Sequence, residues 1–548
     1  MRVYFAAAVC TWGYLTCAGA PAHAAEITDL ASSFEKDKPF GFKLGATYNF
    51  TYKTASINRE SVPLLQSTQT AKDVNAHYNV KPGDQLARTE IVPDLLYTQR
   101  KQTMSLDLAI GIFQDLQLGV SLPLVLRDER QYDLHPNAGW NTCPAGAWDC
   151  VANSSSTFLD GIYPIQPSDQ LSSGSTIFHP PVRGGSGANL LDTINISLMG
   201  APVSQRRDPS KPTWVIGVEG QISIGNIMAY DNTRNYLDPN NPLQKTLIDQ
   251  STTNDAQGQK GWQGVSDGVH KIVIKTALSH KFKYVDPYLG LYYVLPIARK
   301  DDGSPWKPDY GFAQKFSSPQ QQAGTTFGFE ATPLENKRKG HRLALDFRGG
   351  INFHFLGRGY SEAWELFAAS NALICDDQNP LPQPFNYKDP SARPGIGNQI
   401  TQGTFNPACR QAAADAVTGD PRSLLTNKSP YYQQPYTGLT LIENYLTFTA
   451  EAAVIAELFH HARLRLAFNY LRDQGHIITQ DDAGSINYPD NNRNAANGGR
   501  NCNPTRVDLS CPVDWNPAFR QSINVAGRHY RVDDVNSFSG SAMLQAYW

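Results

Sequence analysis

Long apolar runs are missing from this chain of 548 residues once its first two dozen residues are passed. A membrane-spanning helix needs about 20 consecutive apolar residues, and no later stretch approaches that length. Charge is also scarce and balanced, since charged residues make up 18% of the chain and the formal net charge is −2. Without a basic excess, nucleic acid is not an expected partner. The mature chain is therefore either soluble or crosses a membrane as strands.

The first residues have the features of a cleavable signal sequence. Arg2 supplies a positive charge, residues 3–20 are mostly apolar and small, and Ala22-His23-Ala24 has the small-x-small form that signal peptidase recognises. A membrane anchor is the alternative, but the apolar run is short for one. The mature chain is expected to begin at Ala25 or Glu26. With the later start, residues 1–25 are the signal peptide and 26–548 form a single domain.

Metal-binding spacings of cysteine are absent. Of the eight cysteines, two lie in the signal sequence, and the other six show neither the Cys-x-x-Cys spacing nor the nearby histidines of a zinc site. They fall into neighbouring pairs: Cys143 with Cys150, Cys375 with Cys409, and Cys502 with Cys511. Six cysteines allow fifteen connectivities, of which sequential pairing is the simplest. Three structural disulfides, an oxidising compartment and no metal or cofactor are therefore expected.

Alternation of apolar and polar residues is the strongest feature of the chain. Apolar residues stand at every second position in 106–112, and the pattern resumes in 116–126 after Gln114-Asp115, as in a tight hairpin. Similar runs recur from Phe40 to the C-terminal Trp548. Counting 88–113 as one long strand gives twelve strands, and fourteen is the alternative. The predicted fold is all-β, a transmembrane antiparallel up-and-down β-barrel of the outer membrane of a Gram-negative bacterium.

The connections between strands alternate in length. Short ones follow Phe113, Ala201, Lys281, Pro333 and Ala456. Long polar loops are expected at about 57–87, 128–189, 227–267, 299–321, 357–438 and 474–535. Outer-membrane barrels have short periplasmic turns and long extracellular loops. The aromatic C-terminus, Tyr547-Trp548, resembles the signal by which such barrels engage the insertion machinery, which is an expected partner together with outer-membrane lipid.

Charged residues share the strand face opposite the apolar one. In a dry protein core they would cost too much free energy, whereas the lumen of a membrane barrel accepts them. Mixed charges of this kind can line an aqueous path or interlock into a plug, and the sequence leaves both open. The predicted lumen-lining residues are Asp107, Glu219, Lys271, Lys275, Glu330, Arg342, Asp346, Arg348, Glu451, Arg463 and Arg465.

The hairpin at 105–130, with Leu122-Pro123-Leu124 in its second strand, resembles the outer-membrane transporter family associated with the MetA pathway of phenol degradation. The resemblance covers about a twentieth of the chain. It implies a channel of similar size and leaves the substrate open.

Few residue patterns typical of enzymes occur in the sequence. His460-His461, Asp376-Asp377 and Asp481-Asp482 lack the spacing of a zinc or EF-hand site, and solvated turns or acidic loops are the simpler interpretation. No serine stands beside the histidines as a nucleophile would, so no catalytic residue is predicted.

The leading hypothesis is a channel or transporter for small solutes, with hydrophobic or aromatic molecules among the candidates. A structural barrel whose loops bind a surface partner is the alternative, and an outer-membrane hydrolase is the least favoured. The sequence leaves the oligomeric state open.

Overall fold

The computed structural model describes the barrel wall and part of the connections. The described residues are 25–31, 41–61, 63–64, 89–136, 152–153, 157, 182–184, 191–230, 262–300, 304–306, 318–336, 340–369, 437–459, 461–481, 521–524 and 527–547. The six cysteines of the expected disulfides lie outside these ranges, so their pairing stays a prediction.

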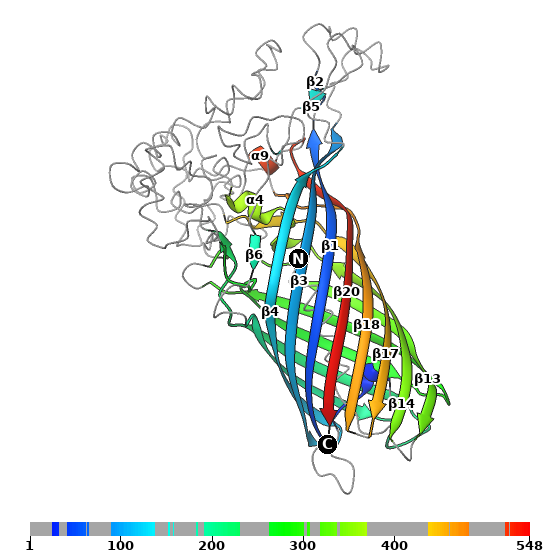
Figure 1. Cartoon of the computed structure of the whole chain (residues 1–548). Helices are drawn as coiled ribbons and strands as arrows, with labels where there is room; N and C mark the ends of the chain where they lie inside the picture. Colours follow the sequence, from blue (N-terminus) through cyan, green and yellow to red (C-terminus); the bar gives the residue numbers. More distant parts are fainter. Residues whose placement is uncertain are drawn as a thin grey trace, which may run out of the picture.

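Twelve long strands form one antiparallel sheet that closes on itself (Figure 1). They are β1 (Phe42–Ser61), β3 (Glu90–Phe113), β4 (Leu116–Leu134), β7 (Thr193–Val203), β8 (Thr213–Ser223), β11 (Val269–Ser279), β12 (Val285–Ala298), β13 (Gln322–Asn336), β14 (His341–His354), β17 (Tyr445–Leu458), β18 (Ala462–Asp473) and β20 (Tyr530–Tyr547). Pairing of β1 with β20, from Lys43↔Tyr547 to Arg59↔Tyr530, closes the sheet and removes its free edges. The predicted twelve-stranded barrel is confirmed, and the range predicted as one strand at 88–113 is β3.

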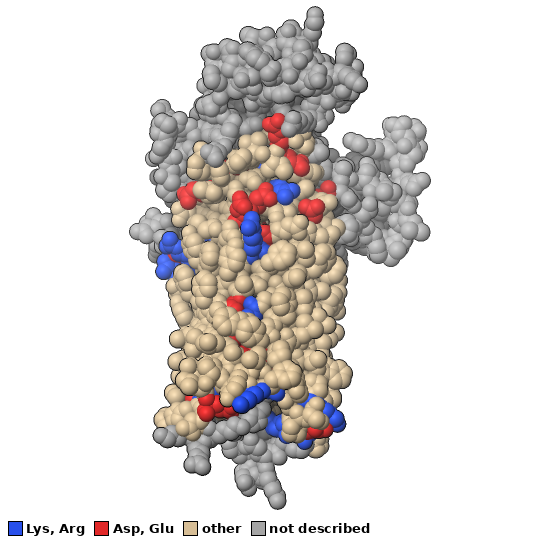
Figure 2. Space-filling model, turned by 90° about the vertical axis from the view of Figure 1, so that its right-hand side faces the viewer, with Lys and Arg blue, Asp and Glu red and all other residues tan. Residues whose placement is uncertain are grey.

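The outer surface of the barrel wall is apolar. Leu44, Ile274 and Leu291 alternate with buried residues along their strands, and each is about half exposed. On the face shown in Figure 2, charged side chains gather towards the two ends of the barrel and leave an almost uncharged belt between them. A protein in water would bury such side chains, whereas an outer-membrane barrel turns them towards lipid. The protein is therefore an outer-membrane β-barrel.

The strand ends joined by short and by long connections lie at opposite ends of the barrel. Residues 114–115, 204–212 and 280–284 join strands at the end where β20 finishes, and β13 approaches β14 and β17 approaches β18 at that same end. The strand ends joined by the longer connections lie at the other end, with most of the short elements (Figure 1). This is the predicted arrangement, in which the short turns face the periplasm.

Three strands run farther outwards than the sequence indicated. β1 ends at Ser61 and β4 at Leu134, while β20 begins at Tyr530. The expected loop limits were 57, 128 and 535. In these extensions the inner face is mixed, since Ile57 and Tyr132 are buried there together with Arg59 and Arg130. The outer face carries polar side chains such as Arg127 and Gln131, which are exposed. The apolar-outward alternation by which a membrane strand is recognised is therefore lost.

Short elements surround the extracellular end. Small two-stranded ladders join β2 (Pro63–Leu64) to β5 (Ala152–Asn153), β9 (Ala229–Tyr230) to β10 (Trp262–Gln263), and β15 (Gly357–Gly359) to β16 (Thr440–Ile442). β6 (Val182–Gly184) pairs with β4, and β19 (His476–Ile477) pairs with β20. Of the helices, α4 (Trp364–Ala369) and α9 (Gln521–Asn524) lie at this end, whereas η1 (Glu26–Thr28) lies inside the barrel. Within the described ranges, none of the helices has the length and apolarity needed to cross a membrane.

Candidate functional site: the barrel lumen

The inner wall of the barrel is polar and charged. The structure places all eleven charged residues singled out by the sequence on the buried side of their strands, because successive side chains of a strand point to opposite faces. None of these side chains is more than 12% exposed. They do not form one site. Seven of them lie on β13, β14, β17 and β18, and the other four lie on β3, β8 and β11.

The first group is an interlocked network of arginines and carboxylates. Near the periplasmic end, Arg342 contacts Glu330 and its Nη1 lies 3.0 Å from Oε1 of Glu457. The same Oε1 lies 2.6 Å from Nη2 of Arg463. Strand register causes this, because Glu457 is directly opposite Arg342 on one side and Arg463 on the other.

The network continues at mid-height. Arg348 contacts Asp346, and Nε of Arg348 lies 3.5 Å from Oε1 of Glu451. Arg465 contacts Glu451 as well, and its Nη2 lies 3.6 Å from Oδ2 of Asp346. Tyr288 donates a 2.6 Å hydrogen bond to Asp346. Ion pairs this deeply buried gain little net stability over apolar packing, but removal of one partner costs about 3–5 kcal/mol. On this side of the lumen the charges interlock and do not line an open path.

Residues 25–31 lie inside the barrel and complete the network; we call them the N-terminal plug. Glu26 accepts a 2.8 Å hydrogen bond from Nε of Arg465, and its Oε2 lies 3.6 Å from Nη2 of Arg348. Asp29 accepts a 2.9 Å hydrogen bond from Nη2 of Arg463. The plug therefore adds two carboxylates to a network in which strand carboxylates already contact each of the arginines.

The plug also reaches the opposite wall. The Thr28 and Ser279 hydroxyl oxygens are 2.6 Å apart, and the backbone amide of Ala31 donates a 2.6 Å hydrogen bond to Oε1 of Gln117 on β4. Ile27 and Leu30 belong to a buried apolar cluster that includes Val273 of β11. The segment thus spans the lumen from β18 to β4 near its periplasmic end.

A second segment closes the extracellular end; residues 360–368, which include most of α4, are called the cap. Phe367 and Leu366 belong to a buried cluster with Ile57, Tyr97 and Tyr132 of the extended strands. Phe367 also packs against Tyr530, with 5.0 Å between the ring centroids. Buried apolar side chains at the extracellular ends of β1, β3, β4 and β20 therefore support the cap.

Buried ion pairs anchor the cap to the wall. Nζ of Lys53 donates a 2.9 Å hydrogen bond to Oε1 of Glu362. Arg130 contacts Glu365, and the Tyr132 hydroxyl oxygen lies 2.6 Å from both Oε2 of Glu365 and the Glu362 carbonyl oxygen, either of which can accept its proton. Since each pair joins the cap to a different strand, the cap is held in one position.

Three stacked rings lie beside the cap. His354, Tyr445 and His476 stack with centroid separations of 4.2 and 3.9 Å and nearly parallel planes. His476 belongs to β19, outside the membrane-spanning strands, and burial lowers the pKa of its imidazole. Glu362 and Asp473 favour its protonated form, but the loss of hydration dominates. His476 is therefore neutral at pH 7.

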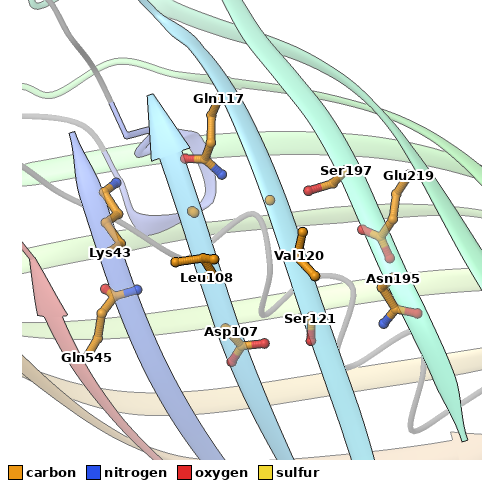
Figure 3. Close-up of a pocket in the computed structure, with 12 residues that line it drawn as sticks. Lys43, Asp107, Leu108, Gln117, Val120, Ser121, Asn195, Ser197, Glu219 and Gln545 are labelled. Atoms are coloured by element: carbon orange, nitrogen blue, oxygen red, sulfur yellow. The ribbon is translucent and has the colours of Figure 1, made fainter. Parts of the chain in front are cut away.

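Two cavities occupy the other side of the lumen, along β1, β3, β4, β7 and β8; together we call them the polar chamber. Together with adjoining space open to solvent, the lower one comprises about 350 Å³ and the upper one about 590 Å³, and Asn195 lines both. Figure 3 shows polar side chains from several strands around the lower cavity, namely Lys43, Asp107, Gln117, Ser121, Asn195, Ser197, Glu219 and Gln545. The upper cavity is lined by Thr47, Asn49, Lys101, Thr103, Ser105, Asp192, Thr193, Asn195, Gln221 and Lys271, with some apolar groups.

Charges in and beside the polar chamber are paired locally. Nζ of Lys275 lies 2.6 Å from Oε2 of Glu219, and Nζ of Lys271 lies 2.8 Å from Oδ2 of Asp267. Asp107 accepts a 3.2 Å hydrogen bond from Ser105. Hydroxyl and amide groups make up most of the remaining lining, so the chamber offers many hydrogen-bonding groups and little net charge.

Sequence reasoning missed the residues of the plug and the cap. Glu26 and Asp29 precede the first strand, and Lys53, Glu362 and Glu365 lie in or against a segment expected to be loop. No periodicity marks them. The one available signal was the acidic pair directly after the predicted cleavage site, with no basic residue beside it.

The remaining candidate ligands do not assemble into a site. Asp481 lies 3.0 Å from Nη2 of Arg358, and His461 is 3.1 Å from the Tyr547 carbonyl. His460, Asp376, Asp377 and Asp482 lie outside the described residues. Among the residues that the structure describes, no group of three or more histidine, cysteine, aspartate or glutamate side chains could hold a metal ion.

No family model and no curated protein matches the chain. Solved structures with similar outlines include an outer-membrane channel from Pseudomonas putida F1, at 8% identity and TM-score 0.28, covering 92% of this chain and 96% of that one. A Pseudomonas aeruginosa FadL homologue is 7% identical with a TM-score of 0.28, and the match covers 93% of this chain and 90% of that one. The Escherichia coli outer-membrane protease OmpT is 6% identical with a TM-score of 0.23, and the match covers 93% of this chain and 97% of that one.

Identities and TM-scores this low transfer neither a mechanism nor a substrate to this chain. The resemblance of the 105–130 hairpin to the phenol-degradation transporter family stays a prediction.

Proposed function

We propose that this barrel is an outer-membrane channel for small solutes and that the polar chamber is part of their path. The observation that carries the proposal is the asymmetry of the lumen. Charges on the β13–β18 side are interlocked with the plug, whereas the β1–β8 side retains two cavities lined by polar groups. A solvent-connected space lined by hydrogen-bonding groups is what a path for small polar solutes requires.

The lining favours polar, hydrogen-bonding solutes over hydrophobic or aromatic ones. Hydroxyl and amide groups predominate in both cavities, and within the described part of the chain no aromatic side chain lines either of them. Because the plug and the cap occupy the lumen below and above, passage requires that they move or that solute passes beside them. The apolar belt of the wall would contact lipid throughout.

Ion selectivity in planar bilayers tests the proposal. Wild-type barrel should give discrete conductance steps. Glu219→Gln leaves the Lys275 ammonium without its carboxylate partner and should shift the reversal potential towards anions. The matched double variant Glu219→Gln/Lys275→Met removes both charges and should return the potential close to the wild-type value. A folded barrel that conducts in none of these forms would overturn the channel proposal.

A further inference from the structure

Asp286 of β12 is a buried carboxylate without a counter-ion among the described residues. It is 3% exposed, and neither carboxylate oxygen accepts a hydrogen bond in suitable geometry. Lys281 and Arg342 attract the Asp286 carboxylate electrostatically from farther away, but each contacts another carboxylate. Lys281 lies 3.8 Å from Glu335, and Arg342 contacts Glu330. An ionised carboxylate left unpaired in such a place is costly, so a positive group is expected beside it.

The plug brings a suitable group to this carboxylate. Ala25 is fully buried, and its backbone nitrogen lies beside Asp286, together with the Ser279 hydroxyl. Within an uncleaved chain that nitrogen is a neutral amide. Hydrolysis of the Ala24–Ala25 bond consumes one water, leaves a carboxylate on Ala24 and frees an amine on Ala25. This amine takes up a proton near neutral pH.

We infer that the mature protein begins at Ala25 and that its α-ammonium group is the counter-ion of Asp286 inside the barrel. The sequence left Ala25 and Glu26 open as the first residue. A start at Glu26 would place the ammonium against Glu330, whose Oε2 is 3.2 Å from the Glu26 nitrogen. Glu330 already contacts Arg342, and Asp286 would stay unpaired. Only the start at Ala25 satisfies both carboxylates.

The charge balance around the plug supports this assignment. Seven carboxylates gather there, and only four guanidinium groups of the network face them. The carboxylates are Glu26, Asp29, Asp286, Glu330, Asp346, Glu451 and Glu457, and the guanidinium groups are those of Arg342, Arg348, Arg463 and Arg465. Arg206 and Lys281 approach from the periplasmic turns. An ammonium at Ala25 reduces the excess of negative charge where it is most deeply buried.

The consequence is that cleavage completes the plug. Before processing, residue 25 lacks the charge that pairs with Asp286; after processing, the chain end is anchored in the lumen. The idea that this anchoring closes a solute path rests on the proposed function. The ion pair between Ala25 and Asp286 is independent of that function and can be tested without any measurement of conductance.

The experiment uses full-length protein exported with its own leader and purified from outer membranes. Mass spectrometry of the N-terminal peptide should show Ala25 as the first residue. Formaldehyde with cyanoborohydride, which methylates free amines, should then label this terminus at least tenfold more slowly in the folded barrel than in urea. Asp286→Asn should raise the folded-state rate severalfold, whereas the matched Glu330→Gln should change it much less.

A second measurement needs no variant. A paired ammonium keeps its proton to higher pH, so the labelling rate of the folded wild-type terminus should rise with a midpoint at least one pH unit above the ordinary range of about 7.7–8.0. A start at Glu26, a midpoint within the ordinary range, or equal labelling of the wild type and a folded Asp286→Asn variant would overturn the inference.

Discussion

Neighbouring positions on one strand meet opposite environments in this barrel. Ile274 is 52% exposed towards lipid, and the next residue, Lys275, is buried in the lumen against Glu219. A charge is therefore tolerated at one position and costly one residue away. The physical reason is that the lumen offers polar partners, whereas the hydrocarbon of the membrane offers none.

The first prediction at this scale is that Ile274→Arg destabilises the inserted barrel. Ile274 is at the middle of β11, so its side chain lies near the bilayer midplane, where an arginine costs about 2–4 kcal/mol. Urea titrations of barrels refolded into lipid vesicles should show this loss. The matched variant Ile274→Leu should remain within about 1 kcal/mol of the wild type, and equal stability of the arginine variant would contradict the lipid-facing assignment.

The second prediction concerns the stacked histidine His476. Its pKa is lowered in the folded protein by burial, so the unfolded chain binds a proton more readily. The stabilisation is therefore fully present above the unfolded pKa of about 6.5 and is lost as the pH falls below it towards the folded value. The segment around β19 and the cap should become more sensitive to protease between pH 7.5 and pH 5.

His476→Phe provides the control for this pH dependence, because it keeps an aromatic ring in the stack with Tyr445 but cannot take up a proton. Its protease sensitivity should change much less over the same pH range. An equal change in both proteins would assign the effect to other titrating groups.

The N-terminal plug alters the expected effect of reversing the charge of the lumen arginines. On a bare wall, Arg348→Glu or Arg465→Glu would shift ion selectivity with little effect on folding. In the structure both arginines contact Glu26 of the plug and carboxylates of other strands. Charge reversal at either position would place a fourth carboxylate beside Glu26, Asp346 and Glu451. Loss of stability and release of the plug are the expected results.

A milder test removes charge from the plug alone. The double variant Glu26→Gln/Asp29→Asn keeps the size of both side chains but weakens their pairs with Arg463 and Arg465. Conductance in planar bilayers should rise severalfold, because the plug leaves the lumen more often. Asp208→Asn, which removes a charge from an exposed periplasmic turn, is the matched control and should conduct like the wild type. Equal conductance of both variants would mean that the plug does not limit passage.

For the whole molecule, orientation is the property that can be tested most directly. Ser210 is exposed in a turn at the end of the barrel assigned to the periplasm, and Glu90 is exposed at the opposite end of β3. In intact cells, a membrane-impermeant maleimide should label Glu90→Cys and leave Ser210→Cys unmodified until the outer membrane is opened. Labelling of Ser210→Cys in intact cells would reverse the orientation.

The wild-type protein serves as the background control for that experiment. Its six mature cysteines should be unreactive if they form the three predicted disulfides. Labelling of the wild type before reduction would show free thiols and contradict that prediction.

The twelve-strand barrel and its two faces could be read from the sequence because both depend on a period of two along each strand. Ile272, Ile274 and Leu278 indicate an apolar face by themselves, and Lys271 and Lys275 indicate the polar one. The lengths of the connections supplied the orientation. These are local properties, since neighbours in the sequence are neighbours on the strand.

Contacts across the lumen were decided only by the tertiary structure. Asp29 meets Arg463, and Lys53 meets Glu362, over sequence separations of 434 and 309 residues. Such pairs depend on how strand register places inward side chains at one height and on which segments enter the barrel. No periodicity encodes that choice. The sequence therefore determined that the lumen is charged, and the closed barrel decided that one side interlocks with the plug while the other side keeps the polar chamber.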